Sequence, residues 1–298
     1  MHDARTVNAD GVALHCPVSA SIEDASRPLA VLVHGFPDTP LTWRHLAPAL
    51  EAAGFRVTTP FLRGYAPSTV PDDGCFQTAA SSLDMCAVHD AFDGDERAVL
   101  VGHDWGAPIV YGAAAHEPAR WSQIVGMAVP PGPAIANALV SDVEQLKLSW
   151  YMFFFQHPLA DLVAPSNDLA LIDAIWADWS PGLDAADDIA AVKESLRDPA
   201  NLAAAIGYYR AALGGIGARE DLAAAQAATT QRPPQPTLYL HGADDGCIRR
   251  EVAETAAELL PPHPDDTELT VEVIDGTAHF LHLDAPTIVN DRILEFLT

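Results

Sequence analysis

Positive charge is scarce in this sequence of 298 residues, where 16 Lys and Arg residues stand against 41 Asp and Glu residues. The resulting formal net charge of −25 repels the phosphates of nucleic acids and the headgroups of anionic lipids. Nucleic-acid binding and electrostatic attachment to a membrane are therefore both disfavoured, and we expect neither partner.

Long apolar runs are also missing. The most apolar segments are too short or too interrupted to span a bilayer, and residues 1–15 lack the basic start and apolar run of a secretory signal. With 49% hydrophobic residues, the chain can still bury a large core. These features predict a soluble cytoplasmic protein.

Cysteine is the third scarce residue, with four widely separated positions in the chain. A chain of this length does not need a disulfide framework, and the sequence has no Cys-x-x-Cys pair that would suggest a metal or redox site. We expect four reduced thiols in the core: Cys16, Cys75, Cys86 and Cys247.

Short apolar runs rich in β-branched residues recur along the chain and predict buried strands. They lie at 29–33, 55–59, 98–102, 124–129, 237–242 and 269–274. Alanine- and leucine-rich stretches of helical length separate several of them, at 43–53, 106–117 and 247–260. This alternation predicts an α/β fold with a mostly parallel sheet flanked by helices, and Asp10-Gly11 predicts an additional hairpin turn.

The alternation stops after the run at 124–129 and resumes near residue 235. Pro-Pro-Gly-Pro opens the intervening region and Arg-Pro-Pro-Gln-Pro closes it, and proline clusters are typical of boundaries because they stop helices. We predict a core domain formed by residues 1–130 and 231–298, with an inserted helical cap at residues 131–230. A second independent domain is the less favoured interpretation at this length.

The segment Gly-His-Asp-Trp-Gly, at 102–106, connects a predicted strand directly to a predicted helix. A nucleophile elbow has this arrangement, with small residues flanking a nucleophile at the tip of a tight turn. A glycine-flanked aspartate alone is more often a simple turn or a helix cap, but its position after a strong strand favours Asp104 as a nucleophile. A carboxylate that attacks saturated carbon forms an ordinary ester, whereas attack on an acyl group would form a reactive anhydride. Alkyl transfer therefore fits Asp104 better than esterase or peptidase chemistry.

The His-Gly-Phe-Pro segment at 34–37 follows the first strong strand, where backbone amides can turn toward the end of the sheet. We predict that the N–H groups of Phe36 and Trp105 form an oxyanion hole, and that the Phe36-Pro37 bond is cis. Without the other motifs, His-Gly-Phe-Pro would indicate only a turn that ends a strand.

Candidates for a base and an acid come later in the chain, in the order that this kind of active site requires. His279 lies on a predicted loop after the last strand and is favoured as the base over His282. Asp244 and Asp245 follow the preceding strand, and the Gly-x-x-Asp spacing favours Asp245 as the acid that orients His279, with Asp244 as a turn residue.

These segments, together with Arg-Gly-Tyr-Ala-Pro-Ser at 63–68, resemble the α/β-hydrolase family of epoxide hydrolases over nearly the whole chain. The core motifs are shared with haloalkane dehalogenases, so the cap must discriminate between the two activities. Two cap segments resemble those that carry paired tyrosines in epoxide hydrolases, and the resemblance maps the pair to Tyr151 and Tyr209. Tyr208 is the alternative to Tyr209.

The resemblance implies an α/β-hydrolase fold and hydrolysis of a small apolar epoxide by water to a vicinal diol, with no metal or organic cofactor. It also allows a monomer or a homodimer. The first alternative is a haloalkane or haloacetate dehalogenase, in which the indole of Trp105 and a second cap donor such as Trp150 or Trp176 would bind the halide. Phe36 argues against it, because haloalkane dehalogenases commonly carry asparagine there. The second alternative is a non-catalytic member of the fold that binds a small ligand.

Overall fold

The computed structural model describes residues 3–260 and 268–298. Residues 1–2 and 261–267, which the predicted core domain includes, lie outside the described residues. The strands are β1 (Asp3–Ala9), β2 (Val12–Val18), β3 (Leu29–Val33), β4 (Arg56–Thr58), β5 (Ala98–His103), β6 (Trp121–Met127), β7 (Thr237–Gly242) and β8 (Leu269–Ile274).

The helices fall into three groups along the chain. Those of the N-terminal part are η1 (Pro40–Arg44), α1 (Leu46–Ala52), α2 (Thr78–Ala91), α3 (Gly106–His116) and η2 (Pro118–Arg120). The middle of the chain contains α4 (Ala134–Ser141), α5 (Val143–Leu148), α6 (Trp150–Phe154), α7 (Ala160–Val163), α8 (Ser166–Trp179), α9 (Ala186–Leu196), α10 (Pro199–Gly214), η3 (Glu220–Leu222) and α11 (Ala223–Ala228). The C-terminal part contributes α12 (Arg250–Leu259), α13 (Leu281–Asp284) and α14 (Pro286–Leu297).

The described strands form one eight-stranded sheet in the order β1-β2-β4-β3-β5-β6-β7-β8. β1 pairs antiparallel with β2, and β2 with β4, whereas all pairs from β4 to β8 are parallel. The mostly parallel sheet is therefore confirmed. The predicted hairpin turn is confirmed as well, since Ala9 pairs with Val12 across Asp10-Gly11.

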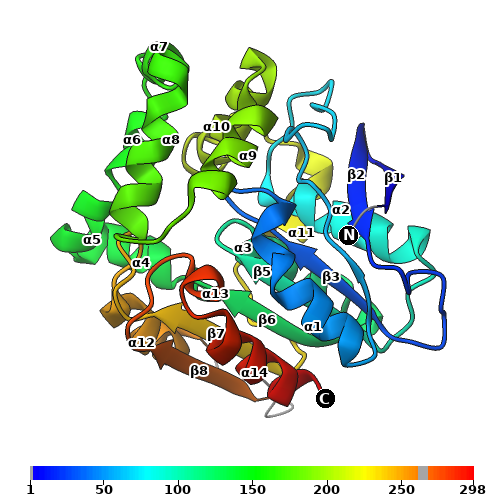
Figure 1. The fold of residues 1–298 in the computed structure, drawn as a ribbon. Coiled ribbons are helices and arrows are strands. Elements are labelled where there is room, and N and C mark those ends of the chain that lie inside the picture. Colours follow the sequence, from blue (N-terminus) through cyan, green and yellow to red (C-terminus); the bar gives the residue numbers. More distant parts are fainter. Residues whose placement is uncertain (1–2, 261–267) are drawn as a thin grey trace.

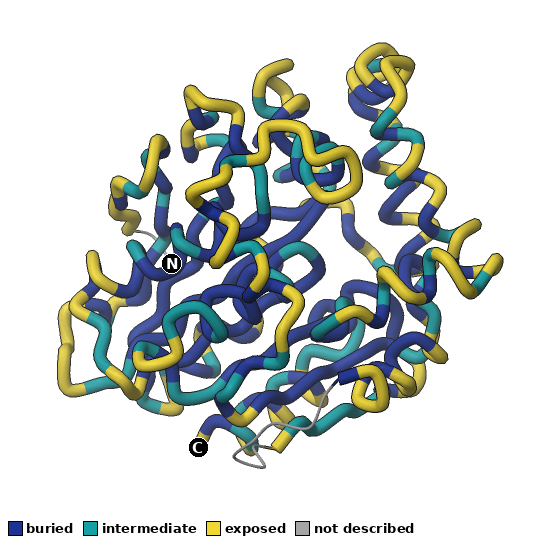
Figure 2. Tube along the Cα trace, turned by 180° about the vertical axis from the view of Figure 1, so that it is seen from behind, coloured by how far each residue is buried: buried dark blue, intermediate teal, exposed yellow. Residues whose placement is uncertain are grey.

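Both faces of the sheet are covered, and this explains why the central strands are apolar at successive positions. In β3, Val31 and Val33 belong to the buried cluster that includes side chains of α2 and α3, whereas Leu32 belongs to the opposite cluster with side chains of α1 and α14. Figure 1 shows these two helical layers on either side of the sheet. The central strands β3, β5 and β7 are buried along their whole length, and Figure 2 shows the exposed residues gathered mainly on loops and outer helical turns.

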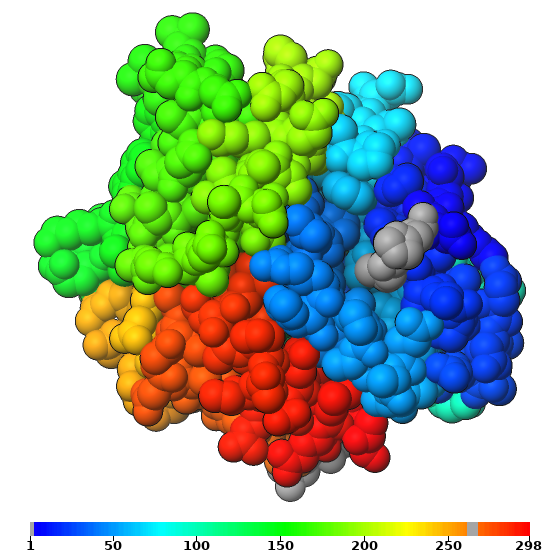
Figure 3. Space-filling model, in the orientation of Figure 1, coloured from blue at the N-terminus to red at the C-terminus, as the bar shows by residue number. Residues whose placement is uncertain are grey.

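Helices of the middle region form a further layer over one edge of the core. Figure 1 shows α6, α7, α8 and α10 standing above the sheet, and Figure 3 shows the same green to yellow-green residues seated against the blue and red parts of the chain. Helix α11, which lies within the predicted cap range, packs against α2 and α3. The exact division at 131–230 stays a prediction.

All four cysteines are buried and free, as expected. In the described part of the chain, no helix combines the length and the apolar character needed to cross a membrane.

A buried ion pair fixes the loop that follows β4. The guanidinium of Arg63 donates to both carboxylate oxygens of Asp84, from Nε and from Nη2, at 2.7 Å each. Both side chains are 1% exposed. The Arg63 guanidinium also donates to the Cys75 carbonyl at 2.9 Å. Burial without these contacts would leave a charge without water or a partner, so the loop and α2 depend on each other.

We expect Arg63→Met to destabilise the protein by about 3–5 kcal/mol, because it leaves the Asp84 carboxylate buried and unpaired. Urea denaturation followed by circular dichroism measures the change. Arg250→Met is the matched control, since Arg250 pairs with Glu254 on the exposed side of α12 and should change stability little. If Arg63→Met and Arg250→Met lowered the free energy of unfolding by the same amount, this account of the buried pair would be contradicted.

Candidate active site

The turn between β5 and α3 holds Asp104 in a left-handed backbone conformation, with φ of 51°. An added Cβ at Gly102 would collide with the backbone of Gly106, and one at Gly106 would collide with the carbonyl of Val33. Because β5, α3 and the end of β3 approach so closely, only glycine fits on either side of the aspartate. A non-glycine residue with positive φ at such a turn is typical of a functional site.

The Asp104 carboxylate has two differently placed oxygens. The N–H of Phe36 donates to Oδ1 at 2.7 Å, while Oδ2 lies 3.5 Å from Nε2 of His279. The Phe36-Pro37 peptide bond is cis, as expected. Trp105, the other predicted oxyanion donor, occupies the N-cap of α3 directly after the nucleophile. One oxygen is thus held by backbone, and the other faces the imidazole.

The structure brings His279 and Asp245 together. Nδ1 of His279 lies 3.0 Å from Oδ2 and 3.2 Å from Oδ1 of Asp245, and both side chains are fully buried. Oδ1 of Asp245 also accepts the N–H groups of Cys247 and Ile248, at 2.7 and 3.0 Å. Asp244, the alternative acid, is exposed. Its position agrees with the interpretation of Asp244 as a turn residue.

His279 lies between two carboxylates, and this determines its protonation. Burial by itself lowers the pKa of His279, but the charge of Asp245 and the contacts with Asp104 and Asp245 outweigh burial and raise the pKa to about 10. The charge of His279 in turn lowers the pKa of Asp245, against the effect of burial. The imidazole is therefore protonated while Asp104 carries its negative charge.

His282, the rejected candidate for the base, has a different environment. Its ring stacks on Trp43, with 5.1 Å between the ring centroids, and its Nε2 contacts the hydroxyl of Thr42. Burial lowers the pKa of His282 well below its usual range. It does not line the cavity next to Asp104.

A cavity of about 280 Å³ opens beside Asp104. Residues that follow β5, β6 and β7 form its floor, and side chains of α4, α6 and α10 form its walls, including Ile135, Leu139 and Leu213. Among the described lining residues, Asp104 is the one with a charged side chain. The cavity suits a small, largely apolar molecule that presents one reactive group to the carboxylate.

Tyr151 on α6 and Tyr209 on α10 both line this cavity, and their rings meet edge to face with 5.5 Å between centroids. The hydroxyl of Tyr151 lies 3.3 Å from the Cys247 sulfur. The buried hydroxyl of Tyr209 and the indole N–H of Trp105 lie beside each other, and neither has another hydrogen-bond partner among the residues that the structure describes. Buried polar groups are normally hydrogen-bonded, so these two are available to a bound molecule.

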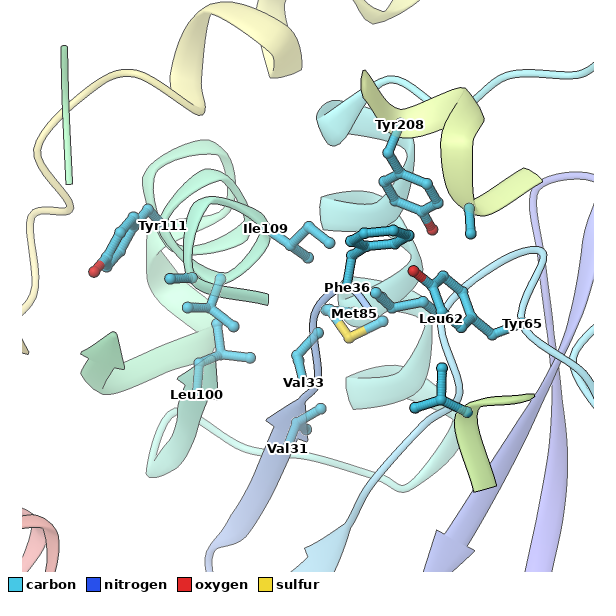
Figure 4. Packing of buried hydrophobic residues seen from close by; sticks show 14 of the residues in the cluster. Val31, Val33, Phe36, Leu62, Tyr65, Met85, Leu100, Ile109, Tyr111 and Tyr208 are labelled. Carbon is cyan, nitrogen blue, oxygen red and sulfur yellow. The ribbon is translucent and has the colours of Figure 1, made fainter. Parts of the chain in front are cut away.

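Tyr208 points elsewhere. Its hydroxyl donates to the Arg63 carbonyl at 3.0 Å and accepts from the Ser81 hydroxyl at 3.4 Å. Figure 4 shows the ring reaching from α10 toward Tyr65 and Phe36 in the core. Of the two neighbouring tyrosines, Tyr209 therefore reaches the cavity and Tyr208 anchors the helix.

Both cavity tyrosines keep their protons at neutral pH. Burial is the main cause that raises the pKa of Tyr151 and of Tyr209 well above the usual range, and the negative charge of Asp104 adds to it. Each phenol can therefore act as a hydrogen-bond donor and, when a strong base forms beside it, as an acid.

Trp179 was not singled out from the sequence, yet it connects the acid loop to the histidine loop. Its carbonyl at the end of α8 accepts the N–H of His279 at 3.2 Å and the N–H of Gly246 at 3.1 Å. Its ring lies edge-on to the His279 ring, with 4.7 Å between centroids. A backbone carbonyl leaves no signature in the sequence, so no residue pattern could have indicated this contact.

The cap tryptophans named as possible halide donors lie outside the cavity lining. The indole N–H of Trp176 donates to the Pro37 carbonyl at 2.8 Å, and Trp150 is 45% exposed on the surface. Of the tryptophan side chains in the described residues, Trp105 lines the cavity and no second one does.

A family model described as alpha/beta hydrolase fold matches residues 28–286. The Bacillus subtilis (strain 168) protein AB hydrolase superfamily protein YfhM is 28% identical over 297 residues, covering 98% of this chain and 96% of that protein. Epoxide hydrolase A of Mycobacterium tuberculosis (strain ATCC 25618 / H37Rv) is 27% identical over 333 residues, covering 99% of this chain and 97% of that protein.

A crystal structure of Epoxide Hydrolase A from Mycobacterium thermoresistibile superposes with a TM-score of 0.75 at 23% sequence identity. The match covers 99% of this chain and 98% of that one. It shows the shared fold, including the predicted α/β-hydrolase arrangement of the sheet and its helices.

The raised pKa of His279 predicts how stability depends on pH. A histidine that binds its proton more tightly in the folded state contributes its full stabilisation below the unfolded pKa of about 6.5. That contribution is lost as the pH rises through the folded value of about 10. We expect the free energy of unfolding to fall between these limits by up to about 1.4 kcal/mol per pH unit.

Urea denaturation at about pH 6, 8 and 10 measures this effect, with His279→Gln as the reference that lacks the titrating group. The difference between wild type and variant should shrink as the pH rises. A difference that stays constant over this range would show that His279 does not hold its proton through the two carboxylates.

Proposed function

The chain belongs to the α/β-hydrolase fold family, and within this family we propose that it is an epoxide hydrolase that forms a covalent ester on Asp104. The observation that carries the proposal is the pair of buried phenols, Tyr151 and Tyr209, in the apolar cavity beside the carboxylate. Relatives that span nearly the whole chain include a protein named as an epoxide hydrolase, which supports the same activity.

In the first step, Oδ2 of Asp104 attacks one carbon of the epoxide, because Oδ1 is held by the Phe36 amide. The bond between that carbon and the ring oxygen breaks, and its electron pair moves to the oxygen. The hydroxyls of Tyr151 and Tyr209 donate to this oxygen as its charge develops, and one of them supplies the proton. The product is a hydroxyalkyl ester of Asp104 and a tyrosinate that water reprotonates.

Ester formation prepares the second step, because it removes the negative charge of Asp104. That charge is one of the causes that raise the pKa of His279, so the imidazole loses its proton more easily once the ester has formed. This proton neutralises the hydroxide that remains when water reprotonates the tyrosinate. Neutral His279, oriented by Asp245, then accepts a proton from water, which attacks the ester carbonyl carbon. The Phe36 and Trp105 amides stabilise the tetrahedral anion, and the diol leaves as the Asp104 carboxylate re-forms.

A dehalogenase that uses the same nucleophile is the second candidate, since the Trp105 indole N–H is available in the cavity. It is less favoured, because a halide needs no proton donor and the two tyrosines would have no role. A small-ligand-binding protein without catalysis is less favoured still, because the base His279 contacts both the nucleophile Asp104 and the acid Asp245. A cytoplasmic location and a monomeric or homodimeric state stay predictions.

Turnover of styrene oxide, an aliphatic epoxide, a bromoalkane and fluoroacetate tests the activity, with diol and halide measured separately. We expect diol from the epoxides, no diol with Asp104→Ala, and a loss of kcat of about 100-fold or more in the Tyr151→Phe/Tyr209→Phe double variant. The loss follows from the missing proton donors. Halide release that survives the double change, with no diol, would assign the protein to the dehalogenases.

Tyr65→Phe is the matched control for the double variant. Tyr65 is a buried tyrosine of the same core region, but it does not line the cavity. It should therefore keep nearly the full kcat. A comparable loss in this control would show that removing buried hydroxyls damages the fold rather than the chemistry.

The ester itself can be trapped by removing the base. With His279→Gln, the first step should proceed and hydrolysis should stall, so that one equivalent of epoxide is consumed per enzyme molecule without release of diol. Intact-protein mass spectrometry should then show an added mass equal to that of the epoxide, located on the peptide that contains Asp104. Turnover at the wild-type rate without an adduct would exclude the covalent route through this base.

A further inference from the structure

The cavity beside Asp104 extends along helix α3. Trp105, at the N-cap of this helix, lines the cavity together with Pro108 and Tyr111. These residues follow one another at intervals of three, and residues so spaced lie on one side of a helix. At a rise of about 1.5 Å per residue, they span about 9 Å of the helix axis. The cavity therefore offers room for a chain that leads away from the carboxylate.

Helices α2 and α11 form the far end of this cavity, and they pack against each other and against α3. Thr229, directly after α11, lies close to the second half of α3, because a Cβ atom added at Gly112 would be 2.8 Å from Cγ2 of Thr229. The lining residues of this far end are polar: Thr78, Gln226, Thr229 and Thr230. The lining residues of α4, in contrast, are apolar: Ile135, Ala136 and Leu139.

Two polar groups of the far end are free to bind a ligand. The Thr78 hydroxyl has no hydrogen-bond partner among the residues that the structure describes, although Thr78 is only 7% exposed. In Gln226, Oε1 accepts the N–H of Ala79 at 3.1 Å, and Nε2 donates to the Thr229 hydroxyl at 3.4 Å. A side-chain amide carries two N–H donors, so one of them is left over. Polar groups in such enclosed places normally have partners, and a bound molecule can supply them.

The two free groups lie close together and share one chemical property. The Gln226 side chain binds the N–H of Ala79, which is the residue next to Thr78. Both groups can donate a hydrogen bond, one from an O–H and the other from an N–H. A carbonyl oxygen has two lone pairs and can accept both bonds at once. The pair therefore fits an oxygen acceptor on the ligand.

The charges around the far end favour an acceptor without a charge of its own. Among the described lining residues, Asp104 is the one with a charged side chain. Two arginines contact the beginning of α2, but both are already paired. Arg63 forms the buried ion pair with Asp84, and Arg219 pairs with three carboxylates. A carboxylate or phosphate on the ligand would thus be desolvated without a counter-ion, which is costly.

We propose that the preferred substrate is an epoxide with an uncharged carbonyl group at the other end of its chain, and that Thr78 and Gln226 bind this carbonyl. The inference rests on the proposed epoxide hydrolase function and adds the class of substrate to it. The epoxide meets Asp104, the apolar chain lies along α3, and the carbonyl oxygen accepts from the two free donors. A purely hydrocarbon epoxide would leave both donors without a partner and is therefore the poorer substrate.

The test compares three terminal epoxides of equal chain length, which end in a methyl ketone, a plain alkyl group or a carboxylate. The number of methylene groups between epoxide and ketone is varied, and kcat/KM is measured for each compound. We expect the wild-type protein to favour the ketone over the alkyl compound at the spacing that lets the carbonyl reach Thr78 and Gln226. The carboxylate should be the poorest of the three.

Two variants identify the groups that bind the carbonyl. Thr78→Val keeps the shape of the side chain without its hydroxyl, and Gln226→Glu keeps an acceptor for the N–H of Ala79 but removes the free donor. Each should lower the ratio of kcat/KM for ketone over alkyl by about 3- to 10-fold, as the loss of one neutral hydrogen bond does. The matched control is Thr255→Val on the exposed side of α12, where the hydroxyl donates to the Glu251 carbonyl. It should leave the ratio unchanged.

A ratio that neither Thr78→Val nor Gln226→Glu changes would overturn the proposal, and so would a carboxylate epoxide that is turned over better than the ketone. Titration calorimetry with the ketone diol and the alkyl diol separates this outcome from a failure of the proposed function, because binding of a diol needs no turnover. If no epoxide is hydrolysed but Thr78→Val selectively weakens binding of the ketone diol, the carbonyl site stands and the hydrolase assignment fails. Hydrolysis of the alkyl epoxide with an unchanged ratio gives the opposite result.

Discussion

The turn between β5 and α3 leaves no room for a Cβ atom on either side of Asp104, and the active site is built outward from this steric constraint. Gly102 and Gly106 let strand and helix approach closely, and Asp104 between them adopts a left-handed backbone conformation. The carboxylate is thereby placed where the Phe36 amide reaches one oxygen and His279 faces the other. A wider turn would lose both contacts together.

Electrostatics then links this turn to the loops after β7 and β8. Asp104 and Asp245 are two buried carboxylates on either side of the His279 ring, and a positive charge on the imidazole stabilises both of them. The same arrangement suits the proposed reaction in two steps, in which loss of the Asp104 charge would make the proton of His279 easier to release. In the proposed reaction, the resting state and the ester state differ in the charges of two side chains, Asp104 and His279, rather than by a rearrangement of the fold.

Much of this could be predicted from local sequence. The central strands are buried on both faces, so their apolar runs are continuous, and glycines on both sides of Asp104 indicate the tight turn. Helix α2 was not predicted, because small and polar residues such as Ser81 and Ser82 are buried along it and no apolar stripe forms. The carbonyl of Trp179 was missed for a different reason, since backbone contacts between distant segments leave no trace in residue type.

Tyr208 and Tyr209 are successive residues whose side chains leave α10 in different directions, one bound to the Arg63 carbonyl and the other facing the cavity. The hydrogen bond of the Tyr208 hydroxyl therefore holds the rotation of α10 about its axis, and this rotation directs Tyr209 into the cavity. Because the two tyrosines are adjacent in the sequence, the angle between their side chains about the axis of α10 is fixed as long as the helix stays intact. For changes of substrate preference, substitutions at Ile135 and Leu139 on α4 would alter the cavity lining without touching the contact between Tyr208 and the Arg63 carbonyl.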